Sequence, residues 1–156
     1  MKKTKIRSYC KINLLLRVVK RLKNGYHSIS SIITFCNLYD TISISKTNSK
    51  KDKICFSGKF SKNINPNSNT ITEVLYHLRN KNFINKESLR IDIKKNIPHG
   101  SGLGGGSSNA ASLLNYFNKK MALSLSKKKI RKFASEVGFD VPINLEKRNT
   151  FLTGKR

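Results

Sequence analysis

The sequence is poor in acidic residues, tryptophan, cysteine and proline. Among 156 residues, 8 Asp plus Glu stand against 32 Lys plus Arg, so the net charge is +24. The three cysteines are odd in number and widely spaced, and they lack clustered histidines, which disfavours a disulfide scaffold or a zinc site. No stretch approaches the ~18 consecutive apolar residues of a membrane-spanning helix. An integral membrane protein is therefore excluded.

The N-terminal segment, MKKTKIRSYCKINLLL, begins like a secretory signal peptide. Lys11 and Asn13 interrupt its apolar run, however, and no small-residue cleavage site follows. We therefore expect a cytoplasmic protein without a membrane partner. The length suits one domain, residues 1–156, and the hydrophobic fraction of 37% is enough for a modest core.

The positive charge has two explanations. A charge of +24 on a chain of this length is typical of proteins that bind nucleic acids or anionic membranes. Lys outnumbers Arg by 24 to 8, however, and Asn and Ile are abundant, as AT-rich codons would produce. Outside residues 46–53 and 127–132 the basic residues are dispersed, whereas a dedicated nucleic-acid surface favours Arg and interleaved aromatics. We favour compositional bias and expect no specific nucleic-acid partner.

Alternating hydrophobic residues predict three strands in the first third of the chain and a fourth at residues 89–93. Residues 10–18 alternate with period two, and further strands are expected at residues 27–35 and 38–45. The core face of the first strand would carry Cys10, Ile12, Leu14, Leu16 and Val18. Lys11 and Asn13 would share the opposite face. Residues 46–53 read as a charged loop.

Helical periodicity predicts three helices, all in the second half of the sequence. The first is capped near Asn69, and its apolar stripe is Ile71, Val74, Leu75 and Leu78. The second runs over about residues 107–121. The third is capped by Ser126 and closed by Gly138. The fold class is therefore α+β.

A glycine-rich loop between the fourth strand and the second helix is the most informative segment. Five of residues 100–106 are glycine, so the backbone can approach a ligand closely and adopt positive φ. Ser107 and Ser108 then open a helix, whose free amides and dipole favour an anion. No Gly-Lys-Ser/Thr follows, so the loop is not a Walker A motif. The pattern predicts a phosphate cradle, the alternative being a flexible turn without a ligand.

The loop resembles the second motif of the GHMP kinases, the superfamily of galacto-, homoserine, mevalonate and phosphomevalonate kinases. Its triple glycine is most similar to the branch that phosphorylates a cytidine-diphosphate-linked methylerythritol for isoprenoid synthesis. Two more segments agree in order and spacing, namely Lys11 to Leu14 with Gly25 to His27, and Gly138 to Pro142. Asn69 to Ile71 matches a weaker element of the family. The resemblance implies a GHMP kinase N-terminal domain with a fold like ribosomal protein S5 domain 2. The family's second, C-terminal domain is absent from these 156 residues.

The resemblance also implies how ATP would bind. Backbone amides of the loop would hold its phosphates, and the serine hydroxyls at the helix start would reach the phosphates or Mg²⁺. No side chains are assigned as a protein metal site. The ATP-binding residues would be Pro98, His99, Gly100, Ser101, Gly102, Leu103, Gly104, Gly105, Gly106, Ser107 and Ser108.

Catalysis would rest, by the same resemblance, on Asp140 and Lys11. Asp140 would accept the proton of a substrate hydroxyl, while Lys11 would keep that carboxylate ionised and stabilise the developing alkoxide. Asn13, Tyr26 and His27 would bind the substrate, Tyr26 by stacking on its cytosine. The alternatives are a helix-end Asp140, a solvated Lys11 and a Tyr26 that packs a hairpin corner.

These observations favour ATP-dependent phosphorylation of a small-molecule substrate, at the 2-hydroxyl of the methylerythritol group. A basic, non-enzymatic RNA-binding α+β domain is the alternative from another class, and a catalytically inactive kinase fragment is a third. The glycine–serine loop favours the kinase, because RNA binding needs no phosphate cradle of this kind. The oligomeric state is left open.

Overall fold

A computed structural model describes residues 3–21, 25, 27–84, 87–120 and 123–155. In this part of the chain five strands form one sheet: β1 (Thr4–Arg21), β2 (His27–Lys46), β3 (Lys53–Ser57), β4 (Leu89–Lys94) and β5 (Thr150–Lys155). The helices are α1 (Thr70–Asn80), α2 (Gly105–Lys120), α3 (Lys127–Val137) and the short 3₁₀-helix η1 (Pro142–Leu145). None of the helices within these ranges is long and apolar enough to cross a membrane.

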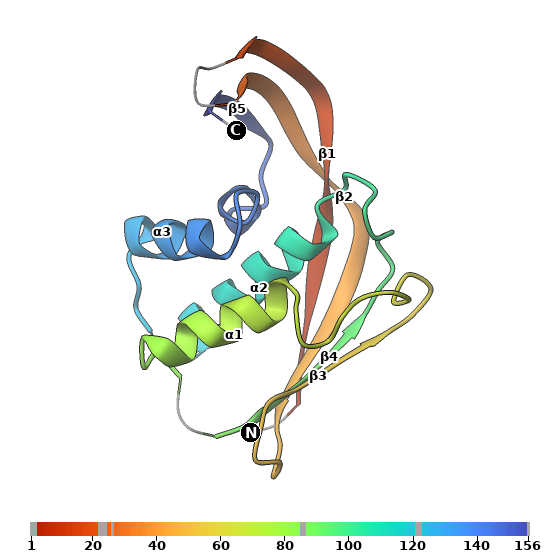
Figure 1. The fold of residues 1–156 in the computed structure, drawn as a ribbon, viewed down its shortest axis with the longest axis vertical. Coiled ribbons are helices and arrows are strands. Elements are labelled where there is room, and N and C mark those ends of the chain that lie inside the picture. The colour runs from red at the N-terminus through yellow and green to blue at the C-terminus, as the bar shows by residue number, and fades with distance from the viewer. Residues whose placement is uncertain (1–2, 22–24, 26, 85–86, 121–122, 156) are drawn as a thin grey trace.

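The sheet has the order β1-β2-β4-β3, and β5 adds to the free part of β2. All pairs are antiparallel except β3 with β4, which is parallel. The helices lie on one side of the sheet, while β1 and β2 continue past them as a long curved hairpin that β5 joins (Figure 1). The domain therefore has a helix-covered half and a hairpin that projects from it.

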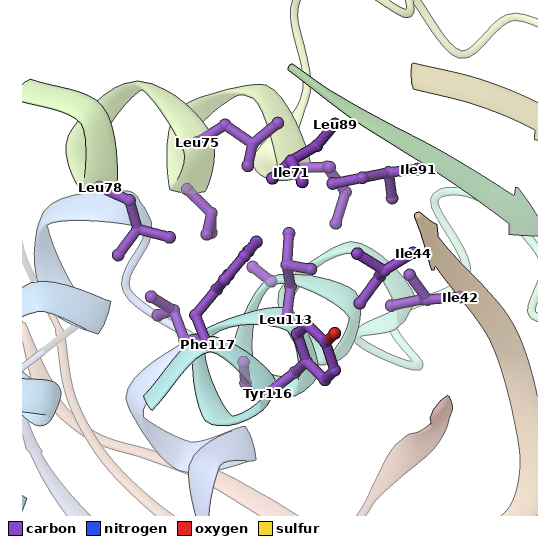
Figure 2. Close-up of a cluster of buried hydrophobic side chains, with 14 of the residues drawn as sticks. Ile42, Ile44, Ile71, Leu75, Leu78, Leu89, Ile91, Leu113, Tyr116 and Phe117 are labelled. Atoms are coloured by element: carbon purple, nitrogen blue, oxygen red, sulfur yellow. The ribbon is translucent and has the colours of Figure 1, made fainter. Parts of the chain in front are cut away.

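The core lies between the helices and the lower half of the sheet. The predicted stripe of α1 is buried at all four positions, and the first and second helices pack on β2 and β4 through the side chains that Figure 2 shows. Phe117 and Leu113 of α2 are fully buried and belong to one hydrophobic cluster with Ile42, Ile44 and Ile91. Each such side chain contributes about 1.5–3 kcal/mol when it leaves water. The buried residues of the strands, which recur every second position, and those of the helices, which recur with the helical period, thus form one hydrophobic cluster.

The predicted helix boundaries are confirmed by their caps. The Asn69 side chain accepts hydrogen bonds from the amides of Ile71 and Thr72, at 2.9 and 3.1 Å. Ser126 caps the third helix by accepting from the Lys129 amide at 3.3 Å. Gly138 ends that helix with an extended backbone, and its amide donates to Ala134. The side chains of Asn69 and Ser126 accept from amides of the first helical turn, which have no partner within the helix.

The strands differ from the prediction more than the helices do. The two strands expected at residues 27–35 and 38–45 are one strand, β2. Its pairing with β1 shifts register at three places, one of which lies between the two predicted strands. Residues 53–57 and 150–155 form strands that the hydrophobic pattern did not indicate. Both are short, and they exist because β4 and β2 offer them open edges.

The predicted core face of β1 is wrong beyond Ile12. Leu14, Leu16 and Val18 are 65%, 57% and 59% exposed. Alternation would bury them only if another layer covered that face, and the helices cover only the start of the strand (Figure 1). Lys11 shows the reverse error, because it was expected on the open face and is 4% exposed.

A buried ion pair joins β2 to the segment that follows β4. Asp40 is fully buried, and its carboxylate accepts from the ammonium of Lys95, itself 3% exposed. The same carboxylate accepts from the amides of Asn96 and Ile97, at 2.7 and 2.9 Å. One side chain therefore fixes the three residues that lead into the glycine loop.

We expect Asp40→Ala to be among the most destabilising single changes in the protein. It would leave a buried ammonium and two buried amides without their acceptor, and such losses cost about 3–5 kcal/mol. Urea denaturation measures the difference. Asp92→Ala on β4 is the matched control, because Asp92 pairs with Arg90 at the surface and its loss should cost less than about 1 kcal/mol. Equal costs for the two variants would contradict the prediction.

Candidate active site

The glycine loop has the backbone conformation that its composition predicts. Gly100, Gly102 and Gly104 have φ of +72°, +75° and +66°, which is the left-handed region that side chains with a Cβ disfavour. The Ser101 hydroxyl donates to the Pro98 carbonyl at 2.9 Å and closes the loop on itself. The loop is thus an ordered turn that leads into the first residues of α2.

The N-terminus of α2 faces a pocket of about 300 Å³, here called the loop pocket. Its lining is Thr70, Lys95, Pro98, His99, Gly100, Ser101, Gly102, Gly104, Gly105, Gly106, Ser107 and Asp140. The first turn of α2 carries no acidic residue, and its last turn carries Lys119 and Lys120. Because the first amides of a helix have no partners within it and lie at the positive end of its dipole, this pocket suits an anion such as phosphate.

Lys11 lies beneath the loop because the loop is attached to β1. Its amide donates to the carbonyl of Leu103 at 3.0 Å, so the loop runs alongside the strand. A Cβ on Gly104 would come within 3.0 Å of the Lys11 side chain, which packs against that glycine. The solvated alternative for Lys11 is therefore wrong.

The ammonium of Lys11 reaches two of the predicted site residues. It forms an ion pair with Asp140 at 3.7 Å, and it donates to the side-chain oxygen of Asn13 at 3.4 Å. That oxygen also accepts from the hydroxyl of Ser31 on β2, at 3.4 Å. The fold thus gathers Lys11, Asn13 and Asp140 beside the loop pocket, although Asp140 is more than 120 residues away in sequence.

Asp140 is held by the turn that joins α3 to η1. The amide of Val141 donates to the carbonyl of Gly138, and the side chain of Asn144 donates to the carbonyl of Asp140 at 2.6 Å. Val141 and Asn144 are fully buried, which anchors the turn, while the Asp140 side chain stays 33% exposed. A carboxylate fixed between a buried ammonium and an open pocket can accept a proton from a hydroxyl bound there.

A second pocket, here called the side pocket, adjoins the loop pocket. It has a volume of about 290 Å³, and the two share Thr70, Lys95, His99 and Gly106. The rest of its lining mixes apolar side chains with amides, namely Phe56, Asn63, Ile64, Asn65, Ser68, Asn69, Ile71 and Asn109. The side-chain oxygen of Asn109 is buried without a hydrogen-bond partner.

Sequence reasoning missed most residues of the side pocket. Lys95, Asn63 and Asn65 belong to no motif, and Asn residues are frequent throughout the chain. Asn109 follows the two serines of the glycine-loop motif, but sequence reasoning assigned it no role of its own. The one available signal was the weak similarity at Asn69 to Ile71, which supports the family resemblance and marks a helix start but does not by itself indicate a pocket. Thr70 in that segment donates to the carbonyl of Gly106 at 2.9 Å and so joins α1 to the loop.

Two predicted site residues do not lie as expected, and a third lies outside the described part of the chain. Ser108 is fully buried, and its hydroxyl donates to the Tyr9 carbonyl at 2.5 Å and accepts from Ser8, so it ties α2 to β1 and does not reach the pocket. The expected hydroxyl role of Ser108 is therefore wrong. His27 pairs with Arg21 at the far end of the hairpin, whereas Lys11 pairs with Phe35. Tyr26 lies outside the described residues.

The residues beside the loop pocket suit Mg²⁺ only as an ion that phosphates help to bind. The described residues hold no group of three or more His, Cys, Asp or Glu that could bind a metal. Mg²⁺ in phosphoryl-transfer sites keeps several waters and uses one or two carboxylates plus the phosphates. Asp140 and the hydroxyl of Ser107, which both line the pocket, fit that limited set of donors.

Known proteins resemble this chain in both sequence and fold. The 4-diphosphocytidyl-2-C-methyl-D-erythritol kinase of Pelagibacter ubique is 44% identical over 146 residues, which are 94% of this chain and 51% of that protein. The kinase of the same name from Thermosipho melanesiensis is 40% identical over 154 residues, which are 96% of this chain and 52% of that protein. The chain thus spans about half the length of the curated relatives it matches.

Solved structures show the same relationship. A crystal structure of 4-(cytidine 5'-diphospho)-2C-methyl-D-erythritol kinase matches with a TM-score of 0.76 at 26% identity, over 97% of this chain and 52% of that one. Homoserine kinase from Cytophaga hutchinsonii shares the fold, with a TM-score of 0.62 at 16% identity over 88% of this chain and 41% of that one. The model of the GHMP kinases N terminal domain matches residues 69–146. This chain therefore belongs to the GHMP kinases and has the fold of their N-terminal domain.

Proposed function

We propose that this chain is the nucleotide-binding half of an ATP-dependent kinase that phosphorylates the 2-hydroxyl of 4-diphosphocytidyl-2-C-methyl-D-erythritol. The observation that carries the proposal is the buried Lys11 ammonium, 3.7 Å from Asp140 at the edge of the loop pocket. The names of the most similar relatives support the choice of substrate. Phosphoryl transfer rests on positioning and charge stabilisation, and this arrangement supplies both.

ATP would occupy the two adjoining pockets. Its phosphates would lie in the loop pocket, against the amides of Gly105, Gly106 and Ser107 at the positive end of α2. Its base would enter the side pocket, whose apolar side chains and amide groups suit a flat heteroaromatic ring with a polar edge. Mg²⁺, held by the phosphates and the Ser107 hydroxyl, would neutralise charge on the phosphates.

The transfer itself would use Asp140 and Lys11. The substrate's 2-hydroxyl oxygen attacks the γ-phosphorus as the bond from that phosphorus to the β–γ bridging oxygen breaks, and ADP leaves. Asp140 takes the hydroxyl proton, while the Lys11 ammonium stabilises the negative charge that develops on the attacking oxygen. Asn13, which accepts from Lys11, would orient that ammonium and contact the substrate.

Nucleotide binding is tested most cleanly at Gly106. A Cβ there meets only Thr70, at 3.6 Å, and Gly106 lines both pockets, so Gly106→Ala should leave the fold intact while placing a methyl group in the cradle. Replacing a helical glycine by alanine also favours the helix. We expect an unchanged or higher Tm together with clearly weaker ATP binding by calorimetry.

Gly105→Val is a poorer test of the same site, although the loop pattern suggests it. Its Cβ would come within 3.0 Å of Ile97, which is fully buried, so loss of binding there would also reflect damage to the core. If Gly106→Ala kept its stability and also full ATP affinity, the amides of α2 would not be the phosphate site.

The proton acceptor is tested in a protein that carries both halves of the kinase. Residues 1–156 would be joined to the remaining half of the Pelagibacter ubique relative, because the chain alone spans about half of that protein and should turn over poorly. Asp140→Asn keeps the shape but removes the base, so kcat should fall by about 10²- to 10⁴-fold. The ATP affinity should survive.

Lys11→Met should act on the same step. The double variant should therefore lose less than the product of the two single losses, because residues that act as a unit are not additive. Near-normal kcat in Asp140→Asn would mean that another group, or none, takes the proton.

A further inference from the structure

Two of the three cysteines face each other across neighbouring strands. The Sγ atoms of Cys10 on β1 and Cys36 on β2 lie 2.9 Å apart, and both residues are free thiols. Cys10 is fully buried, while Cys36 is partly exposed. Cys55 lies on β3 and is exposed. Wide spacing in the sequence gave no indication of this pair, because a cross-strand contact joins residues that are 26 positions apart.

The pair lies where the two strands fall out of register. Tyr9 pairs with Tyr39 and Lys11 with Phe35, so two steps along β1 correspond to four steps along β2. A bulge leaves residues outside the regular ladder and lets the backbone adjust locally. A disulfide has an S–S distance of about 2.05 Å, so the two sulfurs need to approach by less than about 1 Å.

We propose that Cys10 and Cys36 are a reversible dithiol site, oxidised to a disulfide by a small-molecule disulfide such as oxidised glutathione. The sulfur that is partly exposed, on Cys36, is the one that an external reagent reaches first. Burial raises the pKa of the Cys10 thiol to about 11, so Cys10 stays protonated at neutral pH and acts second.

The exchange balances in two steps. The Cys36 thiolate attacks one sulfur of glutathione disulfide, which forms a mixed disulfide and releases one glutathione. The Cys10 thiol then loses its proton as its sulfur attacks the Cys36 sulfur, which breaks the mixed disulfide and releases the second glutathione. The two thiol protons pass to the two released glutathione thiolates. An excess of reduced glutathione reverses both steps.

Oxidation of the pair would weaken ATP binding through Lys11. This consequence rests on the proposed function. Lys11 follows Cys10 directly, and its amide donates to the carbonyl of Leu103 in the glycine loop. Drawing Cys10 towards Cys36 shifts this part of β1 relative to the loop. The oxidised chain should therefore bind ATP more weakly than the reduced chain.

The test treats the purified 156-residue chain with glutathione buffers of increasing oxidised fraction, quenches the exchange with acid, and then blocks the remaining thiols in denaturant, because Cys10 is buried in the folded chain. Three thiols should react in the reduced chain and one, on Cys55, after oxidation. Mass spectrometry of the digested protein should show one peptide pair that contains Cys10 and Cys36 and has lost two hydrogens. Cys36→Ser should abolish that species, and Cys55→Ser is the matched control that should keep it.

A disulfide between Cys10 and Cys36 that returns to thiols in reduced glutathione supports the proposal. Three reactive thiols at every redox ratio, a mixed disulfide that never closes, or a pairing with Cys55 would overturn it. ATP affinity is measured on the same samples. A disulfide without any change in affinity would overturn only the link to the active site, and a reduced chain that binds no ATP would count against the proposed function alone.

Discussion

The position of the glycine loop depends on the hydrogen bonds that the buried Asp40 carboxylate accepts. It accepts from the Lys95 ammonium and from the next two amides, at the point where β4 ends and the loop begins. Without it the first residues of the loop would have buried donors and no acceptor, which is costly inside a protein. The glycines let the loop backbone adopt positive φ, whereas Asp40 holds residues 95–97 in place and so sets the position from which the loop begins. The Lys95 side chain that it holds also lines both pockets.

The loop in turn explains why a lysine can be buried on β1. Leu103 accepts from the Lys11 amide, and Gly104 makes room for the Lys11 stem, so the ammonium emerges beside Asp140. A buried cation needs a partner, and the pairing with Asp140 meets that need at the edge of the pocket where phosphoryl chemistry is proposed. The contacts that bury Lys11 in the fold are thus the same contacts that position its ammonium beside Asp140.

The projecting hairpin has a different character. Leu15, Ile32 and Phe151 pair across β1, β2 and β5, and they are 48%, 40% and 66% exposed. Three large apolar side chains in one row are more than scattered exposure, and such a patch is typical of a surface that another layer covers.

The sequence by itself determined the helices, their caps, the α+β class and the glycine loop, because these depend on neighbours within a few residues. Asn69 and Ser126 cap by local bonds, and a stripe such as Ile71 to Leu78 is set by the helical period. Family motifs added Lys11, Asn13 and Asp140, which the fold brings together. Only the tertiary structure decided which face of β1 is buried, that Ser108 turns inward, that Asn109 lines a pocket and that Cys10 meets Cys36. Each of these depends on what another part of the chain places against the residue, and alternation along one strand cannot report that.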